Sequence, residues 1–444
     1  MTSRNIRLVS VFAAGALLFA ACSDSKDSTD TTGSDTTETT EGTSGAWAVN
    51  TDNCADPAAA EAPITGSLSI GSVVPLSGGV AAIAFSPVAE GMKAYVDYAN
   101  ENNLVPGVTL TFDIGDDQYN KDMTPTAVNT LLDKGVQVFT GIVGTDGNLA
   151  VRDTLNEECI PQIQALSGSP AWRDAENYPW TTGELAPYDI ETKVYAKQLH
   201  EMYPDGVKVG IFHVNSEFGL AYADTLKEVA GDYGIEVVDE QTIEPAETAP
   251  PTAQLNALAD AGAEAVIAVP LGAQCPTFMK EVANVKAAKA GWDPKIFITN
   301  TCASPLILGA AGPAADGLYT SNFIDDIGDP AKAASGNIKT YIDYMTARGA
   351  GDVVTTAAAG WSTMEVTVAI IAQAAKSEAG LSRASIINAA RNLNYTPMLG
   401  RAGVVFKTNG AEDQATAESL TVIQYNATAK TFADVGSLIT EFES

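Results

Sequence analysis

The stretch LSIGSVVP, residues 68–75, decides the fold of this chain of 444 residues. It is a short apolar run rich in β-branched residues, and a helical pattern follows it as far as Asn103. The alternation continues, with strands predicted at 108–114, 136–143 and 160–166 and helices at 123–134 and 148–158. Strands that alternate with helices in this way form parallel sheets with helices on both faces.

A second set of alternating elements begins after Gly183. Its strands are predicted at 207–213, 235–243, 265–270 and 295–300, separated by helices such as 221–232. Because one hydrophobic core rarely serves more than about 300 residues, the two sets predict two doubly wound α/β lobes, each with a parallel sheet. A long helical stretch at 331–394 precedes late strands near Val404 and Leu420, which indicates that the chain crosses between the lobes more than once.

The charge balance excludes one class of partner. The chain carries 25 Lys and Arg against 55 Asp and Glu, a formal net charge of −30. Phosphate backbones and anionic lipid headgroups are bound by clustered cationic residues, so we expect no nucleic-acid partner. We interpret the acidity as a solubility property of a surface in water.

The N-terminus predicts export. An apolar run at 8–21 follows Arg4 and Arg7 and is shorter than the roughly 20 residues that cross a bilayer, as in a cleaved signal peptide. Its end, LLFAAC at residues 17–22, resembles a bacterial lipobox, with Phe19 where leucine is usual, and makes Cys22 the expected lipid attachment site. The alternative is an ordinary secretory signal cut after Ala21. Residues 23–44 are almost entirely Ser, Thr, Asp, Glu and Gly, which predicts a disordered tether on the outer side of the bacterial membrane.

Four of the five cysteines remain once Cys22 is set aside, and an even number in an exported protein indicates two disulfides. Three pairings are possible. Cys275 and Cys302 each follow a predicted strand, and the ends of neighbouring parallel strands lie within disulfide reach. We therefore expect Cys275 to pair with Cys302 and Cys54 with Cys159; buried free thiols are the alternative.

A series of short motifs then carries a family resemblance. They are Val74-Pro75-Leu76-Ser77-Gly78, Glu90-Gly91 with Asp97 and Asn100, Val105-Pro106-Gly107, Asp116-Asp117, Gly141 to Asn148, Ser167-Gly168-Ser169-Pro170, Thr181-Thr182-Gly183, Phe218-Gly219, Gly400 and Phe406. In this order and spacing, over residues 64–444, the series resembles the branched-chain amino acid binding proteins. These are type I periplasmic solute-binding proteins of ABC importers.

The resemblance implies two α/β lobes that three crossovers join, near Gly183, residues 319–322 and Met398. The lobes close on a small polar or amino-acid-like ligand and deliver it to an ABC permease and ATPase complex. The implied division is a signal peptide at 1–21, a tether at 22–63, lobe 1 at 64–184 with 322–398, and lobe 2 at 185–321 with 399–444. We expect a monomer.

The candidate ligand site follows from position, because open α/β sheets bind ligands beyond the carboxyl ends of their strands. In lobe 1 those ends carry Ser77, Gly78, Gly144, Thr145, Asp146, Ser167, Gly168 and Ser169. In lobe 2 they carry His213, Glu217, Phe218, Leu271, Gly272, Gln274 and Thr301. Hydroxyls and open N–H groups at helix N-termini suit a carboxylate, and the family holds an amino acid's carboxylate with matching loops. The alternative is that these side chains only cap the following helices.

One residue departs from the family pattern. Thr301 stands where amino-acid-binding members have a glutamate that pairs with the ligand's ammonium, and an unpaired buried ammonium costs several kcal/mol. Either Asp146 or Glu217 replaces that partner, or the ligand lacks an α-amine, which we favour. Phe218 is the best candidate for an aromatic wall of the cleft. Tyr188, Trp172 and Trp361 are interpreted as core residues.

The sequence also bears on two other functions, enzyme activity and ligand sensing. The chain contains no G-x-S-x-G, Walker A, G-x-G-x-x-G, C-x-x-C or H-E-x-x-H motif, so we expect no catalytic residues, no cofactor and no enzyme activity. Asp113, Asp116 and Asp117 lack the EF-hand spacing, and we expect no metal site there. A ligand-sensing module for a separate membrane signalling protein is the alternative to import.

The predicted lipid anchor can be tested directly. We expect the mature protein to enter the detergent phase on temperature-induced phase partitioning of Triton X-114 extracts, and Cys22→Ser to move it to the aqueous phase. Wild-type protein found wholly in the aqueous phase contradicts the anchor.

Overall fold

The computed structural model describes residues 46–78 and 80–443. The predicted signal peptide, Cys22 and the tether up to Gly45 lie outside the described residues.

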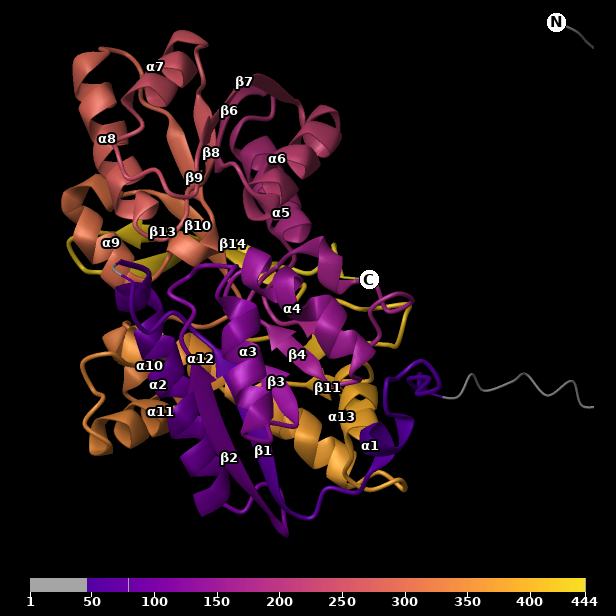
Figure 1. Cartoon of the computed structure of the whole chain (residues 1–444). Coiled ribbons are helices and arrows are strands. Elements are labelled where there is room, and N and C mark those ends of the chain that lie inside the picture. The colour runs from indigo at the N-terminus through magenta and orange to yellow at the C-terminus, as the bar shows by residue number, and fades with distance from the viewer. Residues whose placement is uncertain (1–45, 79, 444) are drawn as a thin grey trace, which may run out of the picture. The chain divides into compact units, whose positions relative to one another are not determined.

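The first sheet has five parallel strands in the order β2-β1-β3-β4-β5. They are β1 (Gly66–Val73), β2 (Val108–Gly115), β3 (Val138–Thr140), β4 (Gln162–Ala165) and β5 (Thr181–Gly183). The predicted strand at 68–75 is β1, which lies between β2 and β3 and is buried along its second half. Figure 1 shows this sheet in the lower half of the molecule.

The second sheet repeats this order and then extends it. Its strands are β6 (Val207–Val214), β7 (Ile235–Ile243), β8 (Ala265–Val269), β9 (Lys295–Ile298), β10 (Tyr319–Asn322), β13 (Leu420–Asn426) and β14 (Thr431–Ile439). The order β7-β6-β8-β9-β10 is parallel and matches the first sheet strand for strand. The two parallel-sheet lobes are as predicted, and β13 and β14 add an antiparallel hairpin at the β10 edge of the second sheet. The short turn at 427–430 accounts for it, because a short loop can join only antiparallel strands.

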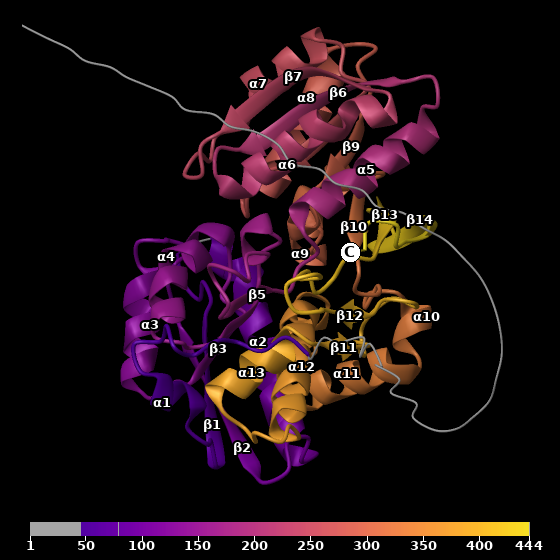
Figure 2. The ribbon, with the colours of Figure 1, turned by 90° about the vertical axis from the view of Figure 1, so that its right-hand side faces the viewer.

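Helices cover both sheets (Figures 1 and 2). In the first half they are α1 (Pro57–Glu61), α2 (Val80–Glu101), α3 (Thr124–Asp133) and α4 (Thr145–Glu157). Around the second sheet they are α5 (Tyr188–Met202), α6 (Glu217–Val229), α7 (Thr252–Asp260), α8 (Gln274–Ala288) and α9 (Pro305–Ala311). The predicted helical stretch at 331–394 is four helices: α10 (Pro330–Ala333), α11 (Gly336–Ala347), α12 (Val354–Ala375) and α13 (Arg383–Ala390). A small sheet of β11 (Asn394–Tyr395) and β12 (Phe406–Lys407) follows.

The chain passes between the two sheets three times, as predicted. It leaves the first sheet after Gly183 and returns after Asn322, and it enters β13 at Leu420. The segments of the second and third crossings lie side by side. Asp325 N donates to Leu399 O, and Arg401 N donates to Phe323 O. Residues 406–416 then hydrogen-bond to Leu393 and Gly183, so this segment packs on elements of the first half before reaching β13.

Helix α12 is the core helix of the first half. By length and composition it is apolar enough to cross a membrane, but 72% of its apolar 18-residue stretch is buried inside the protein. It packs there against α2. Figure 2 shows it among α2, α11 and α13. Gly91 of α2 and Gly360 of α12 allow the close approach, because a Cβ on Gly360 would overlap Val88 O and one on Gly91 would overlap Ala357 O.

Two disulfides are formed, with the pairing expected from the sequence. Cys54 is bonded to Cys159, with their Cα atoms 5.4 Å apart, and Cys275 to Cys302, with Cα atoms 5.8 Å apart. Cys275 lies in the first turn of α8, beyond β8, and Cys302 in the 3-10 helix Asn300–Cys302, beyond β9. The second bridge therefore joins the segments that follow two neighbouring strands, β8 and β9.

The α2–α12 contact gives a stability prediction. Gly360→Ala should lower the free energy of unfolding by about 2 kcal/mol, because the overlap with Val88 O outweighs the better helix propensity of alanine. Gly309→Ala is the matched control, since Gly309 is a helical glycine on α9 with open space around its Cβ. Urea unfolding followed by circular dichroism measures both. Equal stability of the two variants contradicts the proposed contact.

Candidate functional site

The cleft lies where both sheets reverse their strand order. β1 sits between β2 and β3, and β6 sits between β7 and β8, so each sheet has a switch point at which the following loops diverge. Two adjoining cavities open there, an inner cavity of about 210 Å³ and an outer cleft of about 520 Å³. They share Tyr119, Val143, Gly144, Thr145, Phe218 and Leu271. Residues from both sheets and all three crossings thus meet around one space.

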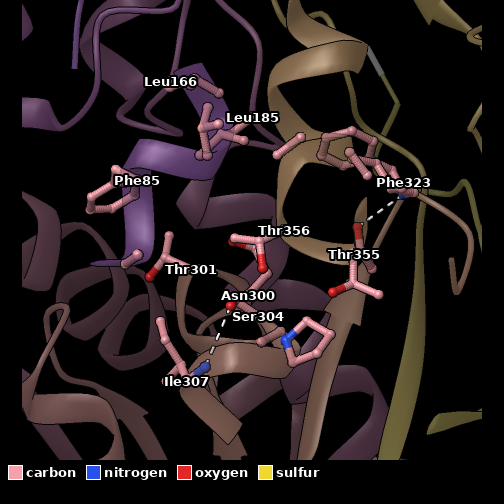
Figure 3. Close-up of a pocket in the computed structure, with 18 of the residues that line it drawn as sticks. Phe85, Leu166, Leu185, Asn300, Thr301, Ser304, Ile307, Phe323, Thr355 and Thr356 are labelled. Carbon is pink, nitrogen blue, oxygen red and sulfur yellow. Dashed lines mark hydrogen bonds between the residues drawn. The ribbon is translucent and has the colours of Figure 1, made fainter. Parts of the chain in front are cut away.

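The inner cavity has a mainly apolar wall. Figure 3 shows Phe85, Leu166 and Leu185 on one side of it, facing Asn300, Ser304 and Ile307. Phe323 and the first turn of α12, with Thr355 and Thr356, form the third side. This composition, apolar with a few hydrogen-bonding groups, is typical of a small-molecule site.

The outer cleft is polar and acidic. Its charged residues are four carboxyl side chains and one lysine: Asp117, Asp146, Glu217, Glu244 and Lys121. Asp117 accepts from Thr124 Oγ1 at 2.8 Å and Glu244 from Asn215 at 2.9 Å. Asp146 and Glu217 lie in the first turns of α4 and α6, where a negative charge is favourable beside the positive end of the helix dipole.

A strained loop carries one aromatic ring into the site. Gln118 and Tyr119 both have positive φ, 56° and 59°, which is costly for side-chain-bearing residues and is found mainly at functional sites. Asp116 holds the loop by accepting from Ser77 Oγ at 2.5 Å and from Leu76 N at 3.0 Å. The Tyr119 ring stacks on Phe85 with ring centres 5.6 Å apart.

Gly144 is required beside this ring. It has φ +93° as the N-cap of α4, and a Cβ there would stand 3.1 Å from Tyr119 Oη. Next to it, Thr145 Oγ1 and Ser167 Oγ share a hydrogen bond of 2.8 Å, and both residues are buried. The loops that follow β3 and β4 are therefore joined beneath the cavity.

The structure brings together only part of the predicted ligand set. Gly144, Thr145, Phe218, Leu271, Gly272 and Thr301 line the inner cavity, and Asp146 and Glu217 line the outer cleft. Ser77, Gly78, Ser167, Gly168, Ser169, His213 and Gln274 line neither of these two cavities.

Each of the side chains outside the cavities has another role in the structure. Ser169 Oγ accepts from Ala171 N and caps a short 3-10 helix, as the capping alternative predicted. His213 is 1% exposed, with Nε2 3.0 Å from Glu240 Oε1. Among the four aromatic residues considered, Phe218 and also Tyr188 line the inner cavity, whereas Trp172 and Trp361 are core residues.

Sequence reasoning missed the contributions of the crossings and of α12. Leu185, residues 322–328, Thr355, Thr356 and Arg401 all line the inner cavity. The predicted crossover near residues 319–322 was a usable signal, because a hinge between two lobes must lie at the base of their cleft. No sequence pattern marked Thr355 and Thr356.

The sequence profile of a family described as periplasmic binding protein matches residues 67–430. The chain belongs to this family. Comparison with curated protein sequences finds no relative. Among solved structures, this periplasmic binding protein is similar to a branched-chain amino acid ABC transporter protein from Thermus thermophilus with bound valine. The TM-score is 0.73 at 20% identity, over 85% of this chain and 97% of that one.

Two further solved structures share the fold. A fatty acid ABC transporter substrate-binding protein from Thermomonospora curvata aligns with TM-score 0.69 at 18% identity, over 85% of this chain and 93% of that one. A possible leucine/isoleucine/valine-binding protein from Rhodopirellula baltica aligns with TM-score 0.68 at 19% identity, over 84% and 98%.

Two buried carboxyl groups attach the crossings of this periplasmic binding protein to α12. Glu184, directly after β5, accepts from Thr363 Oγ1 at 2.5 Å. Glu365 Oε1 accepts from Tyr395 Oη and from Met398 N, both at 2.7 Å, and its Oε2 is buried without a hydrogen-bond partner. Burial raises the pKa of Glu184 to about 8 and the pKa of Glu365 to about 7.

These pKa values predict a pH-dependent stability. Because the folded-state pKa of Glu184 is higher than its unfolded value near 4.5, its stabilisation is complete below pH 4.5 and is lost as the pH rises to 8. Glu184 alone should lower the free energy of unfolding by about 3 kcal/mol between pH 5 and pH 8, and Glu365 should add to this fall. Glu184→Gln should flatten this decline, and Glu378→Gln, at an exposed position, should not. Urea unfolding at several pH values between 5 and 8 measures the free energy of unfolding of each variant. If this free energy depends on pH in the same way for wild type and Glu184→Gln, the prediction is wrong.

Proposed function

We propose that this chain is the extracytoplasmic solute-binding lipoprotein of an ABC importer, anchored through Cys22, which captures a small ligand between its two lobes. The observation that carries the proposal is the inner cavity, whose wall comes from both sheets and all three crossings. A ligand that touches both lobes stabilises whichever arrangement brings them together. The valine-bound and fatty acid transporter proteins of the same fold support a small-molecule ligand.

The division into lobes belongs to this proposal. Lobe 1 comprises 64–184 with 322–398, and lobe 2 comprises 185–321 with 399–444, except that residues 406–416 hydrogen-bond to Leu393 and Gly183 and so belong with lobe 1. The paired segments around Ile324 and Gly400, together with Glu184, supply the hinge, because few residues there need to change conformation for the lobes to rotate. Import further requires a permease and an ATPase, and we propose that the closed, ligand-bound protein is the form that docks on the permease.

The capture mechanism predicts a change in dimensions. Ligand released from the purified native protein and identified by mass spectrometry should, when added back to stripped protein, lower the radius of gyration in small-angle X-ray scattering. Equal dimensions with and without saturating ligand contradict closure.

A pair of substitutions, one in each lobe, tests whether both lobes contribute. Phe85→Ala in α2 and Leu271→Ala after β8 each remove apolar wall from the inner cavity and should weaken binding of the released ligand about tenfold in calorimetry. Leu76→Ala is the control, because Leu76 is an exposed apolar residue outside both cavities. If only one lobe's variant weakens binding, capture between two lobes is wrong.

A further inference from the structure

We propose that the inner cavity takes an uncharged ligand, with a compact apolar body and neutral hydrogen-bonding groups such as an amide or a hydroxyl. This inference rests on the proposed function and narrows its ligand class.

The wall of the inner cavity selects for an apolar body. Phe85 and Leu185 face Ile307 across the space, and Phe323 and Phe432 contribute rings from the crossings and β14. Apolar surface of this kind binds by removing a matching apolar surface from water. A strongly hydrated group placed against it loses its water without compensation.

Two of the three charged side chains that line this cavity are in ion pairs, and the third, Asp326, accepts backbone hydrogen bonds on both carboxylate oxygens. Asp325 forms an ion pair with Lys332, and Arg401 forms one with Asp434 and also donates to Ile324 O. Asp326 accepts from the backbone N–H groups of Gly328 at 2.9 Å and Phe432 at 2.8 Å. A charged ligand group would have to break one of these ion pairs, compete with the backbone N–H groups for Asp326, or remain buried without a counter-charge.

The groups left to recognise a ligand are neutral. Thr355 and Thr356 point their hydroxyls toward the cavity from the start of α12, and Thr301 and Ser304 lie on the opposite lobe (Figure 3). A hydroxyl can donate or accept, so it matches an amide or an alcohol without a net charge on either side. Thr301 itself brings a hydroxyl and no charge to this wall.

The outer cleft works against an anion. It adjoins the inner cavity and is lined by Asp117, Asp146, Glu217 and Glu244, with Lys121 as the one cation among its lining residues. The helix N-termini that could attract an anion already hold carboxylates in their first turns, Asp146 in α4 and Glu217 in α6. Their pull on an anionic ligand is therefore largely offset.

The volume limits the size of the body. The inner cavity has a volume of about 210 Å³. A cavity of about 150 Å³ suffices for benzene. A six-carbon chain or a single ring therefore fits.

The test compares four compounds that share one six-carbon skeleton: hexanamide (neutral), hexanoate (anionic), hexylamine (cationic) and norleucine (zwitterionic). Calorimetry uses the purified mature protein after its own ligand has been stripped. We expect hexanamide to bind at least tenfold more tightly than each of the other three. A charged or zwitterionic compound that binds as tightly as hexanamide overturns the inference, as does a series in which no member binds.

The identity of the natural ligand separates this inference from the proposed function. A neutral apolar ligand released from native protein supports both. A charged ligand that nonetheless closes the lobes in small-angle scattering overturns the inference and leaves capture between lobes standing. A protein that releases no ligand and keeps its dimensions with every compound counts against the proposed function itself.

A second experiment reverses the selectivity. Thr301→Glu should introduce the missing carboxylate at the cavity wall and raise the affinity for hexylamine at least tenfold over that of the wild type. Thr301→Gln introduces a side chain of the same size as glutamate but without its charge. It should leave the affinity for hexylamine at the wild-type value. If the two variants bind hexylamine equally, the lack of a free carboxylate does not determine the ligand class.

Discussion

The constraint on which this structure depends is the direction of its parallel strands. Parallel strands end on one edge of a sheet, and the two sheets repeat the same order, β2-β1-β3-β4-β5 and β7-β6-β8-β9-β10. Each sheet therefore has a switch point on that edge, and helix α2 and the loop beyond Thr140 meet the loops beyond Val214 and Val269 around one space. The crossings close the base of that space because they join the sheets there.

The core of the first half serves the cleft as well as the stability of the fold. Helix α12 packs on α2 through Gly91 and Gly360, and this close approach fixes where its first turn stands. That turn brings Thr355 and Thr356 to the cavity, while Glu184 and Glu365 attach two crossings to the same helix. Core packing, the attachment of the crossings and part of the cavity wall thus share one element, so a change deep in the helix pair should also reach the cleft.

Electrostatics divides the binding region into two parts. The outer cleft has several carboxylates, of which Asp146 and Glu217 also complement helix dipoles. In the inner cavity Asp325 and Arg401 are held in ion pairs and Asp326 accepts backbone hydrogen bonds. An unpaired charge is most costly against the apolar inner wall, where a ligand group loses its water.

The sequence alone determined the element order, the two lobes, the crossings and the disulfide pairing, because periodicity and strand-end positions are local properties that survive folding. It also placed Gly144, Thr145, Phe218 and Thr301 at the cleft, since each directly follows a strand or opens the next helix. Only the tertiary structure decided that Ser77 turns to Asp116 and that β14 completes the second sheet. It alone brought Thr355 and Phe85 to the cavity, because contacts between residues so distant in the chain are set by packing, which leaves no pattern in either segment.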